Sequence, residues 1–402
     1  MAANTSALFG TGLSAAELSR ARILLVILVI NMAMTFPNSV FDSYVTAHEE
    51  FLFQKLLRIV QGLLNPFLTL PLLLLGYGSV ALVLISTLLT AVLLIVNIWY
   101  CTKKLNMRFC FSNLQMSLLK EMWVFTFFIF LAQIIDQVNW SVDKFLLGRM
   151  KGTEEVAVYG VGGQINSLYL EMSVAISAVF IPRVNRIVAS SDDNLELTNL
   201  MTRVGRIQFL VLALILTGFV FFGEPFIKLW AGDGYEQAYN VALVLMIPVT
   251  LPLTQNLGIE IQRAKNKHRV RSIVYACLAI VNVVSSVLLI PRLGSVGAAW
   301  GTAISLVLGN ILFMNWYYHK RMGMRMDLFW KGLIALVPAL LLACLCGWAY
   351  SSFVEISSWA ELIIAICIYV IVYALIVWLL GMNQYEKSLV TGMLKKVGLV
   401  RE

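Results

Sequence analysis

The sequence predicts an all-α integral membrane protein with eleven transmembrane helices, arranged as two pseudo-symmetric lobes, the first incomplete and the second of six helices, followed by two C-terminal helices. Three observations predict this fold class. Hydrophobic residues make up 60% of the 402 residues and charged residues only 13%, and the mean hydropathy is +0.83. Apolar runs near the roughly 20 residues that cross a bilayer recur along the chain. Part of the sequence also repeats itself at an offset of 217 residues.

The eleven predicted spans are continuous apolar runs. A chain of this composition cannot bury its apolar residues inside one water-soluble globule. A membrane β-barrel would need alternating strands of about ten residues. These runs are longer and rich in Leu, Ile and Val, so each is predicted to be a helix. In chain order they are 22–45, 56–76, 80–100, 123–147, 156–181, 209–230, 238–259, 272–290, 296–318, 330–350 and 362–380.

The repeat predicts two copies of one helical unit. Six predicted helices separate equivalent points, an even number, so both copies have the same orientation and their axis should lie along the membrane normal. When the runs 123–147, 156–181 and 209–230 are shifted back by 217 residues, they fall before residue 14, where the chain has no apolar run. The first copy is therefore expected to lack three helices. The clustered identities are Trp99, Tyr100 and Lys103 with Trp316, Tyr317 and Lys320, and Met107 and Arg108 with Met324 and Arg325.

The repeat divides the chain into three predicted parts. Residues 1–120 form an incomplete N-terminal lobe of three helices with a cytoplasmic linker, and residues 121–327 form a complete six-helix lobe. Residues 328–402 form two extra C-terminal helices and a cytoplasmic tail. An incomplete first lobe leaves two alternatives open. Either an upstream start adds about 100 residues with three more spans, or the chain is a truncated, non-functional remnant.

The distribution of Lys and Arg predicts which side of the membrane each loop faces. One set of alternate loops holds 23 of these residues and the opposite set holds six. By the positive-inside rule the first set is cytoplasmic, which places the C-terminus in the cytoplasm. The net charge of +8 is then explained by topology and by attraction to anionic lipid headgroups. No nucleic-acid partner is expected, because a reader of nucleic acid would need a soluble basic fold.

Polar side chains form one face of the predicted helix 123–147. At about 100° per residue, Asp143 lies within about 20° of Asp136. Ionisable groups inside a bilayer are costly and usually face a cavity or a partner. We therefore expect this face to line a water-filled cavity that holds a polar headgroup or exchanges a proton. Alternatively, Asp143 and Lys144 lie near the outer headgroups and only terminate the helix. The other polar residues of this face are Gln133, Asn139 and Trp140, and Lys144, next to Asp143, is a further candidate for lining the cavity.

The predicted helix 156–181 carries a second polar face. Gln164, Ser167 and Glu171 follow the spacing i, i+3, i+7, which places them on one side of a helix. Glu171 lies near the middle of the span, so it is also a candidate for lining the cavity. The alternative is a structural hydrogen bond to a neighbouring helix.

Two further acids lie at nearly equivalent positions of the repeat. Asp42 and Glu260 fall near the cytoplasmic ends of the first and seventh predicted helices. Together with the basic loops, they could form a cytoplasmic gate. The alternative is that each residue caps a helix end.

The sequence shows no motif for catalysis, a cofactor or a metal. No phosphate-binding G-x-x-x-x-G-K-[ST] motif is present, and the glycines at 160–163 follow no predicted strand. His48, His268 and His319 are isolated from one another. An integral-membrane polysaccharide polymerase would carry a large outer loop with catalytic residues, whereas the longest outer loop here, about 223–237, is short. We therefore expect neither an enzyme nor a bound cofactor.

The region 136–165 resembles a known family of transporters. It reads DQVNWSVDKFLLGRMKGTEEVAVYGVGGQI and is followed by FIPRV at 180–184. Its Asp-x-x-[hydrophobic]-Leu-Gly, Gly-Thr-x-x-Val and Tyr-x-x-[Gly/Ala]-x-Gln elements resemble lipid-linked oligosaccharide flippases of the polysaccharide-biosynthesis family. The superfamily of these proteins also holds the multidrug-and-toxin extruders and the peptidoglycan lipid flippases.

The resemblance implies two lobes around a hydrophilic cavity, with alternating access that carries a glycan headgroup while a polyprenyl tail stays in lipid. It implies a flippase that moves polyprenyl-diphosphate-linked oligosaccharide across the bacterial inner (cytoplasmic) membrane for cell-surface polysaccharide biosynthesis. The implied partners are the lipid-linked oligosaccharide, membrane lipids, and polysaccharide polymerase or assembly proteins. Cations commonly meet the pyrophosphate in such proteins, and Lys144 and Arg149 are the candidates here. A drug or cation exporter of the same superfamily is the alternative.

Overall fold

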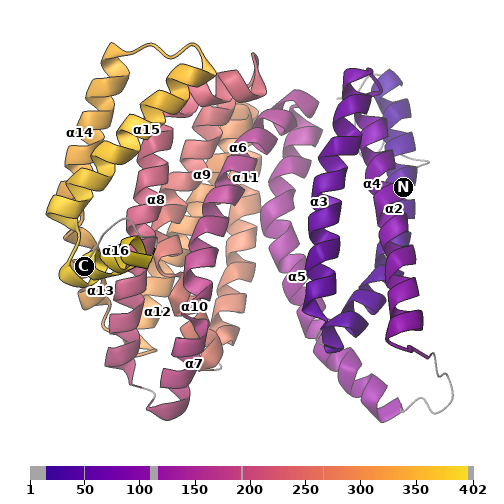
Figure 1. Ribbon diagram of the computed structural model, residues 1–402, viewed down its shortest axis with the longest axis horizontal. Coiled ribbons are helices and arrows are strands. Elements are labelled where there is room, and N and C mark those ends of the chain that lie inside the picture. The colour runs from indigo at the N-terminus through magenta and orange to yellow at the C-terminus, as the bar shows by residue number, and fades with distance from the viewer. Residues whose placement is uncertain (1–14, 49, 109–115, 192, 266, 397–402) are drawn as a thin grey trace. The chain divides into compact units, whose positions relative to one another are not determined.

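The computed structural model describes residues 15–48, 50–108, 116–191, 193–265 and 267–396, and every regular element in these ranges is a helix (Figure 1). The predicted all-helical fold class is thereby confirmed. The chain divides into two compact units, Met1–Phe127 and Phe128–Glu402, which are described in turn. The boundary between the units lies inside helix α5 (Met116–Met150). The division into three parts stays a prediction.

Unit 1 is built around α4, which packs along both α2 and α3. A polar contact joins α2 to α4, because Asn97 Nδ2 donates to Asn38 Oδ1 at 2.8 Å. An unpaired amide would be costly in hydrocarbon, so such a pair stabilises the helix contact. Phe53 stacks on Tyr100 with ring centroids 3.6 Å apart. The described elements are α2 (Ala15–Ala47), α3 (Phe51–Leu74), α4 (Gly78–Trp99), the π-helical turn η2 (Tyr100–Lys104) and the start of α5.

The helices of unit 1 have the surface of membrane helices. In the most apolar 18-residue windows of α2 and α3, 0% of the residues are buried within the structure. Soluble monomers rarely expose apolar surface on this scale. These faces therefore contact lipid or other membrane helices.

Unit 2 is organised around α8 (Asn194–Ala231), which contacts α9, α13, α14 and α15. Its ends follow from the sequence, since Asp193 accepts a hydrogen bond from Leu195 N at 2.7 Å and Gly232 ends the helix with a φ of +86°. The other elements are α6 (Thr153–Ala178), α7 (Ile181–Ser190), α9 (Gln237–Thr254), α10 (Asn256–Ala264), α11 (His268–Leu306), η3 (Val307–Phe313), α12 (Met314–Lys320), α13 (Met326–Ile334), α14 (Val337–Phe353), α15 (Trp359–Ile376), η4 (Val377–Gly381) and α16 (Gln384–Lys396).

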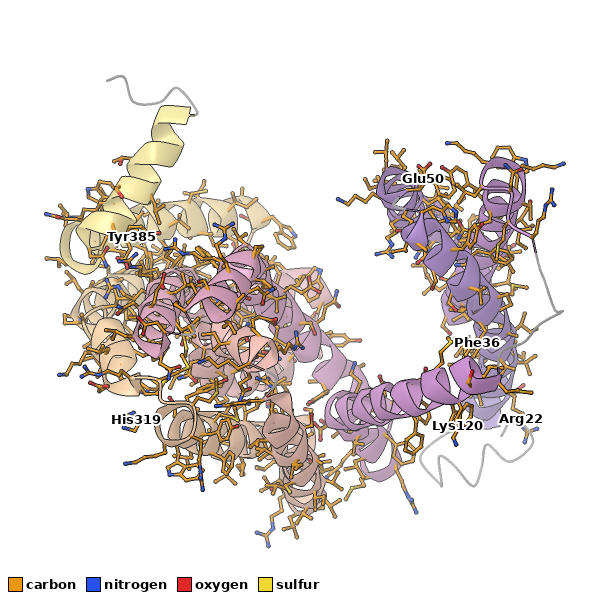
Figure 2. The ribbon with its side chains drawn as sticks, turned by 90° about the horizontal axis from the view of Figure 1, so that it is seen from below. Arg22, Phe36, Glu50, Lys120, His319 and Tyr385 are labelled. Atoms are coloured by element: carbon orange, nitrogen blue, oxygen red, sulfur yellow. The ribbon has the colours of Figure 1, made fainter. Side chains whose placement is uncertain are left out.

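Arg206 of α8 holds the C-terminal helix α16 in place. Its Nε and Nη2 donate to the two carboxylate oxygens of Glu386 at 2.5 and 3.0 Å. Its Nη2 also donates to the main-chain oxygen of Gly381 at 3.1 Å, and both charged side chains are buried. Nearby, the Arg203 guanidinium lies 5.1 Å from the ring of Tyr385, which Figure 2 labels on α16. These contacts fasten the C-terminal helices to α8.

The helix α11 folds back on itself at Gly294. The backbone of Gly294 has a φ of 57° and a ψ of −133°, outside helical geometry. Asn282 Nδ2 donates to Thr302 Oγ1 at 3.3 Å, although 20 residues of straight helix would separate them by about 30 Å. The element therefore consists of two antiparallel halves, which correspond to the predicted spans 272–290 and 296–318.

The described residues contain eight helices long and apolar enough to cross a membrane, or up to nine if α6 and α7, bent by 44°, form one span. One of the eight, Val270–Lys320, contains the fold-back of α11 and so two of the predicted spans. The helix α5 accounts for a further predicted span. The protein is a multi-pass membrane protein, and its helices are compatible with the predicted eleven spans.

The repeat seen in the sequence extends to the helix ends. Equivalent ends and starts, each pair 217 residues apart, are Ala47 of α2 with Ala264 of α10, and Phe51 of α3 with His268 of α11. An equivalent main-chain hydrogen bond also closes the turn at the end of each copy. Met107 N donates to Cys101 O at 2.9 Å, and Met324 N donates to Tyr318 O at 3.0 Å. One helical repeat therefore recurs in the two units.

Candidate functional site

A buried carboxylate of α5 lies at the centre of a polar cluster in unit 2. The exposed fraction of Asp143 is 1%. Its Oδ2 accepts hydrogen bonds from Thr302 Oγ1 at 2.6 Å and from Tyr159 Oη at 3.1 Å. Its Oδ1 accepts a hydrogen bond from Ser286 Oγ at 2.8 Å. With Asn282, which contacts both Ser286 and Thr302, these residues form the Asp143 cluster.

The fold-back of α11 builds this cluster. It brings Ser286 on one half of the helix next to Thr302 on the other. Gly301 permits the close approach, since a Cβ there would lie 2.2 Å from Ser286 Oγ. The turn is also held by α6, because Ser295 N donates to Glu155 Oε2 at 2.7 Å. The cluster therefore depends on α5, α6 and both halves of α11.

Gly301→Ala is expected to destabilise the fold-back. The added methyl group would lie 2.2 Å from Ser286 Oγ and 2.9 Å from Ser286 N, and overpacking of this kind costs about 1–3 kcal/mol. The purified variant should melt at a lower temperature than the wild type. Gly163→Ala is the matched control, because no atom lies within 4 Å of its added methyl group. Equal melting temperatures for the two variants would contradict the expectation.

The Asp143 cluster can hold a proton or a small hard cation. In the described part of the chain, Asp143 forms no ion pair with Lys or Arg. Three hydroxyl donors satisfy its oxygens instead, as a buried carboxylate requires. Carboxylate, hydroxyl and amide oxygens are also the ligands that hard cations prefer. No group of three His, Cys, Asp or Glu side chains suited to a metal occurs among the described residues.

For four of the predicted α5 residues, the structure describes the helix but not the side chain. Their position in a cavity therefore stays a prediction. The two that are described have different surroundings. Asp143 is buried in its cluster, whereas the neighbouring Lys144 is exposed. The helix also continues beyond both residues to Met150. The four residues outside the description are Gln133, Asp136, Asn139 and Trp140.

The three predicted residues of α6 are all exposed. Gln164, Ser167 and Glu171 lie on the side of the helix opposite to buried residues such as Tyr169. Ser167 Oγ donates to the main-chain oxygen of Gly163 at 2.9 Å. This face is therefore available for contact with a substrate or with lipid.

The two predicted gate residues each pair with a basic residue of their own unit. The Asp42 carboxylate lies 3.6 Å from Arg58 Nη2 and accepts a hydrogen bond from Gln54 Nε2 at 2.9 Å. The Glu260 carboxylate lies 2.8 Å from Arg263 Nη1. These local pairs agree with a structural role at the helix ends, and the gate stays a prediction.

Four members of the Asp143 cluster were absent from the site predicted from the sequence: Tyr159, Asn282, Ser286 and Thr302. For two of these four residues, the sequence repeat contained a signal that could have found them. Asn282 is the repeat equivalent of Asn65, and Ser286 is the equivalent of Thr69. A polar residue that recurs at equivalent positions of two apolar stretches marks that position as a candidate for a polar contact. Tyr159 and Thr302 had no such signal.

Comparison with known proteins identifies the family of this chain. A family model described as "Polysaccharide biosynthesis protein" matches residues 15–240. The chain is 25% identical over 316 residues to the uncharacterized membrane protein EpsK of Bacillus subtilis (strain 168), covering 78% of this chain and 62% of that protein. It is 21% identical over 217 residues to a putative O-antigen transporter of Shigella flexneri, covering 54% and 49%.

A third relative is the capsular polysaccharide biosynthesis protein CapF of Staphylococcus aureus, 22% identical over 228 residues, covering 56% of each protein. The chain thus spans about half to three fifths of the length of these relatives. Among solved structures, the lipid II flippase MurJ in an inward closed conformation matches with a TM-score of 0.72 and 14% identity, covering 92% of this chain and 76% of that chain. The two chains share a fold.

Proposed function

We propose that this chain, which belongs to the polysaccharide biosynthesis protein family, is a flippase that moves polyprenyl-diphosphate-linked oligosaccharide across the cytoplasmic membrane. The family match over residues 15–240 carries the proposal. The names of two relatives, an O-antigen transporter and a capsular polysaccharide biosynthesis protein, support the substrate class. The fold shared with a lipid II flippase supports transport of a large lipid-linked headgroup.

The polar faces of α5 and α6 would carry the glycan headgroup. Hydroxyl, amide and carboxylate groups can replace the hydrogen bonds that a sugar makes with water, and Trp140 offers an aromatic face. Lys144 and Arg149, which are both exposed, are the candidate cations for the diphosphate. In this proposal the sugar-contacting residues are Gln133, Asp136, Asn139 and Trp140 of α5, and Gln164, Ser167 and Glu171 of α6.

The Asp143 cluster would couple transport to an ion. It holds a buried carboxylate among hydroxyl and amide oxygens from three helices, so binding a proton or cation there would alter how these helices pack. Ion binding at such a junction can bias a transporter between two arrangements. Asp42 and Glu260 would act at the cytoplasmic gate.

The proposed setting is the inner membrane of a bacterium, with the C-terminus in the cytoplasm. The excess of Lys and Arg on one set of loops supports this orientation. The partners would be the lipid-linked oligosaccharide, membrane lipids, and the polymerase or assembly proteins that consume the exported unit. The chain would carry out transport rather than covalent chemistry.

A deletion strain tests the proposal. Without the protein, lipid-linked oligosaccharide should accumulate on the cytoplasmic leaflet and surface glycan should be lost, and a plasmid copy should restore both. Unchanged glycan together with altered drug sensitivity would overturn the flippase and favour a drug exporter. Failure of the plasmid copy to complement, when a longer gene does complement, would indicate a truncated chain.

A further inference from the structure

A second polar site lies within unit 2, apart from the Asp143 cluster. A cavity of about 380 Å³ is formed by α6, α9, α10, both halves of α11, η3 and α12. It lies toward the end of unit 2 where α10 and α12 are seen in Figure 1, and Figure 2, which looks onto that end, labels His319 at the end of α12. The wall formed by α6 and α9 is apolar and includes Leu170, Val174 and Leu253. The wall formed by α11 and η3 carries Arg271, Tyr275 and Asn310, and we call the cavity the Arg271 pocket.

The charge of Arg271 is held by neutral groups. Its Nη2 donates to Tyr275 Oη at 2.6 Å, and its guanidinium carbon lies 4.6 Å from the centroid of the same ring. Tyr275 Oη in turn donates to Asn310 Oδ1 at 2.9 Å. Among the described residues no carboxylate forms an ion pair with Arg271. The guanidinium is thus positioned by a neutral phenol, while its positive charge has no acidic partner in the pocket.

This arrangement favours a particular ligand class. A guanidinium has five N–H donors in a planar fork that matches phosphate oxygens, and the contact with Tyr275 uses only part of them. An uncharged apolar molecule would leave the cation unpaired. A small soluble anion would leave the apolar wall uncovered. A ligand with a phosphate at one end and a hydrocarbon chain at the other matches both walls.

We propose that the Arg271 pocket binds a phosphate-bearing lipid. The phosphate lies on the Arg271 guanidinium, next to Tyr275 and Asn310, and the first part of the chain lies along Leu170, Val174 and Leu253. Two lipids share this chemistry: an anionic phospholipid of the bilayer and a polyprenyl diphosphate. The second source rests on the proposed function, whereas the first is independent of it.

Binding of phosphatidylglycerol to the purified full chain in detergent, measured by native mass spectrometry, tests the proposal. Arg271→Gln should weaken the tightest binding event about tenfold or more, because charge-assisted hydrogen bonds to the phosphate are lost. Lys267→Gln is the matched control, since it removes an exposed charge four residues earlier and outside the pocket. Equal weakening by both variants, or by neither, would overturn the proposal.

A second variant keeps the charge of Arg271 and adds a bulky side chain to the apolar wall. Val174 is 56% exposed, so Val174→Trp can be accommodated without disturbing the packed core. It should weaken phosphatidylglycerol binding several-fold, because a chain can no longer lie along α6. Undiminished binding would show that the apolar wall contributes nothing and would overturn the assignment of a lipid. Inorganic phosphate at the same concentration should not compete, and competition equal to that of the lipid would overturn it as well.

Two further measurements show which of the two lipids the pocket binds. Competition of polyprenyl diphosphate with phosphatidylglycerol in the wild type, lost in Arg271→Gln, would support one site open to both lipids. Phosphatidylglycerol binding without such competition would support a site for a bilayer phospholipid. Arg271→Gln can also be expressed in the deletion strain. If this variant no longer binds lipid but restores glycan export fully, the result would support the pocket and show that lipid binding there is not needed for transport. A strain that exports glycan normally without the protein would overturn only the proposed function.

Discussion

Asp143→Asn is expected to reduce glycan export to the level of the deletion strain while the protein stays folded. The amide has the shape of the carboxylate and can still accept hydrogen bonds from part of the cluster, but it cannot carry a charge or bind a proton. If the cluster couples an ion to transport, the loss of this charge should be as severe as the loss of the protein. Export is measured as surface glycan in the deletion strain carrying each variant on a plasmid.

Asp233→Asn is the matched control for this variant. Asp233 is exposed in the loop after α8, so the same chemical change there should leave export unchanged. Wild-type export by Asp143→Asn would show that the cluster has no role in coupling. Asp143→Ala should in addition lower the melting temperature, since the Tyr159 and Thr302 hydroxyls lose their carboxylate acceptor and each unsatisfied buried group costs about 1–3 kcal/mol. The Ser286 hydroxyl can still donate to Asn282 Oδ1.

The identity of the ion can be read from the melting temperature of the purified protein. A ligand that binds only the folded state raises stability with its concentration. If the cluster binds Na⁺, added Na⁺ should raise the melting temperature of the wild type but not that of Asp143→Asn, with K⁺ at equal ionic strength as the control. If it binds a proton, the two proteins should differ in their dependence on pH and not on Na⁺.

Much of the fold could be predicted from the sequence, because the hydropathy and charge of each segment depend on where it lies relative to the bilayer. A long apolar run has few alternatives to a helix in hydrocarbon, so the spans were predicted without knowledge of their neighbours. The repeat was predicted from a few aromatic and basic identities, and the structure extends it to helix ends such as Ala47 with Ala264. The fold-back at Gly294 was present in the sequence only as a gap between two predicted spans.

The Asp143 cluster shows where prediction from the sequence stops. Helical periodicity placed Asp143 on one face with Asp136, since it depends only on spacing within a helix. Helical periodicity does not show which other helix that face contacts. The partner hydroxyls of Ser286 and Thr302 lie 143 and 159 residues away in the chain, and their approach depends on the fold-back of α11. Lys144, which follows Asp143 and was also predicted to line the cavity, is exposed beside the buried acid.

Asp136→Ala is expected to abolish glycan export while leaving the protein inserted in the membrane. An acidic residue about a dozen positions inside a predicted span, or roughly 18 Å at 1.5 Å per residue, is retained at a cost of about 2.5–3.5 kcal/mol unless it faces water or a partner. Removal of the carboxylate should therefore not impair insertion. Gln137→Ala is the matched control, because Gln137 is the next residue, is exposed and hydrogen-bonds Ser141 at 2.5 Å.

Asp136→Asn separates charge from hydrogen bonding at this position. Equal loss of export in the Ala and Asn variants would indicate that the charge is required, whereas recovery in Asn would indicate a hydrogen bond to the glycan. Wild-type export by Asp136→Ala would contradict a role in the cavity. The two acids of α5 should also differ in the melting assay: the ion dependence lost in Asp143→Asn should be retained in Asp136→Asn, because the oxygens of the Asp143 cluster are unchanged. Loss of that dependence in both variants would mean that Asp136 and Asp143, whose positions in the sequence are about two helical turns apart, bind one ion together.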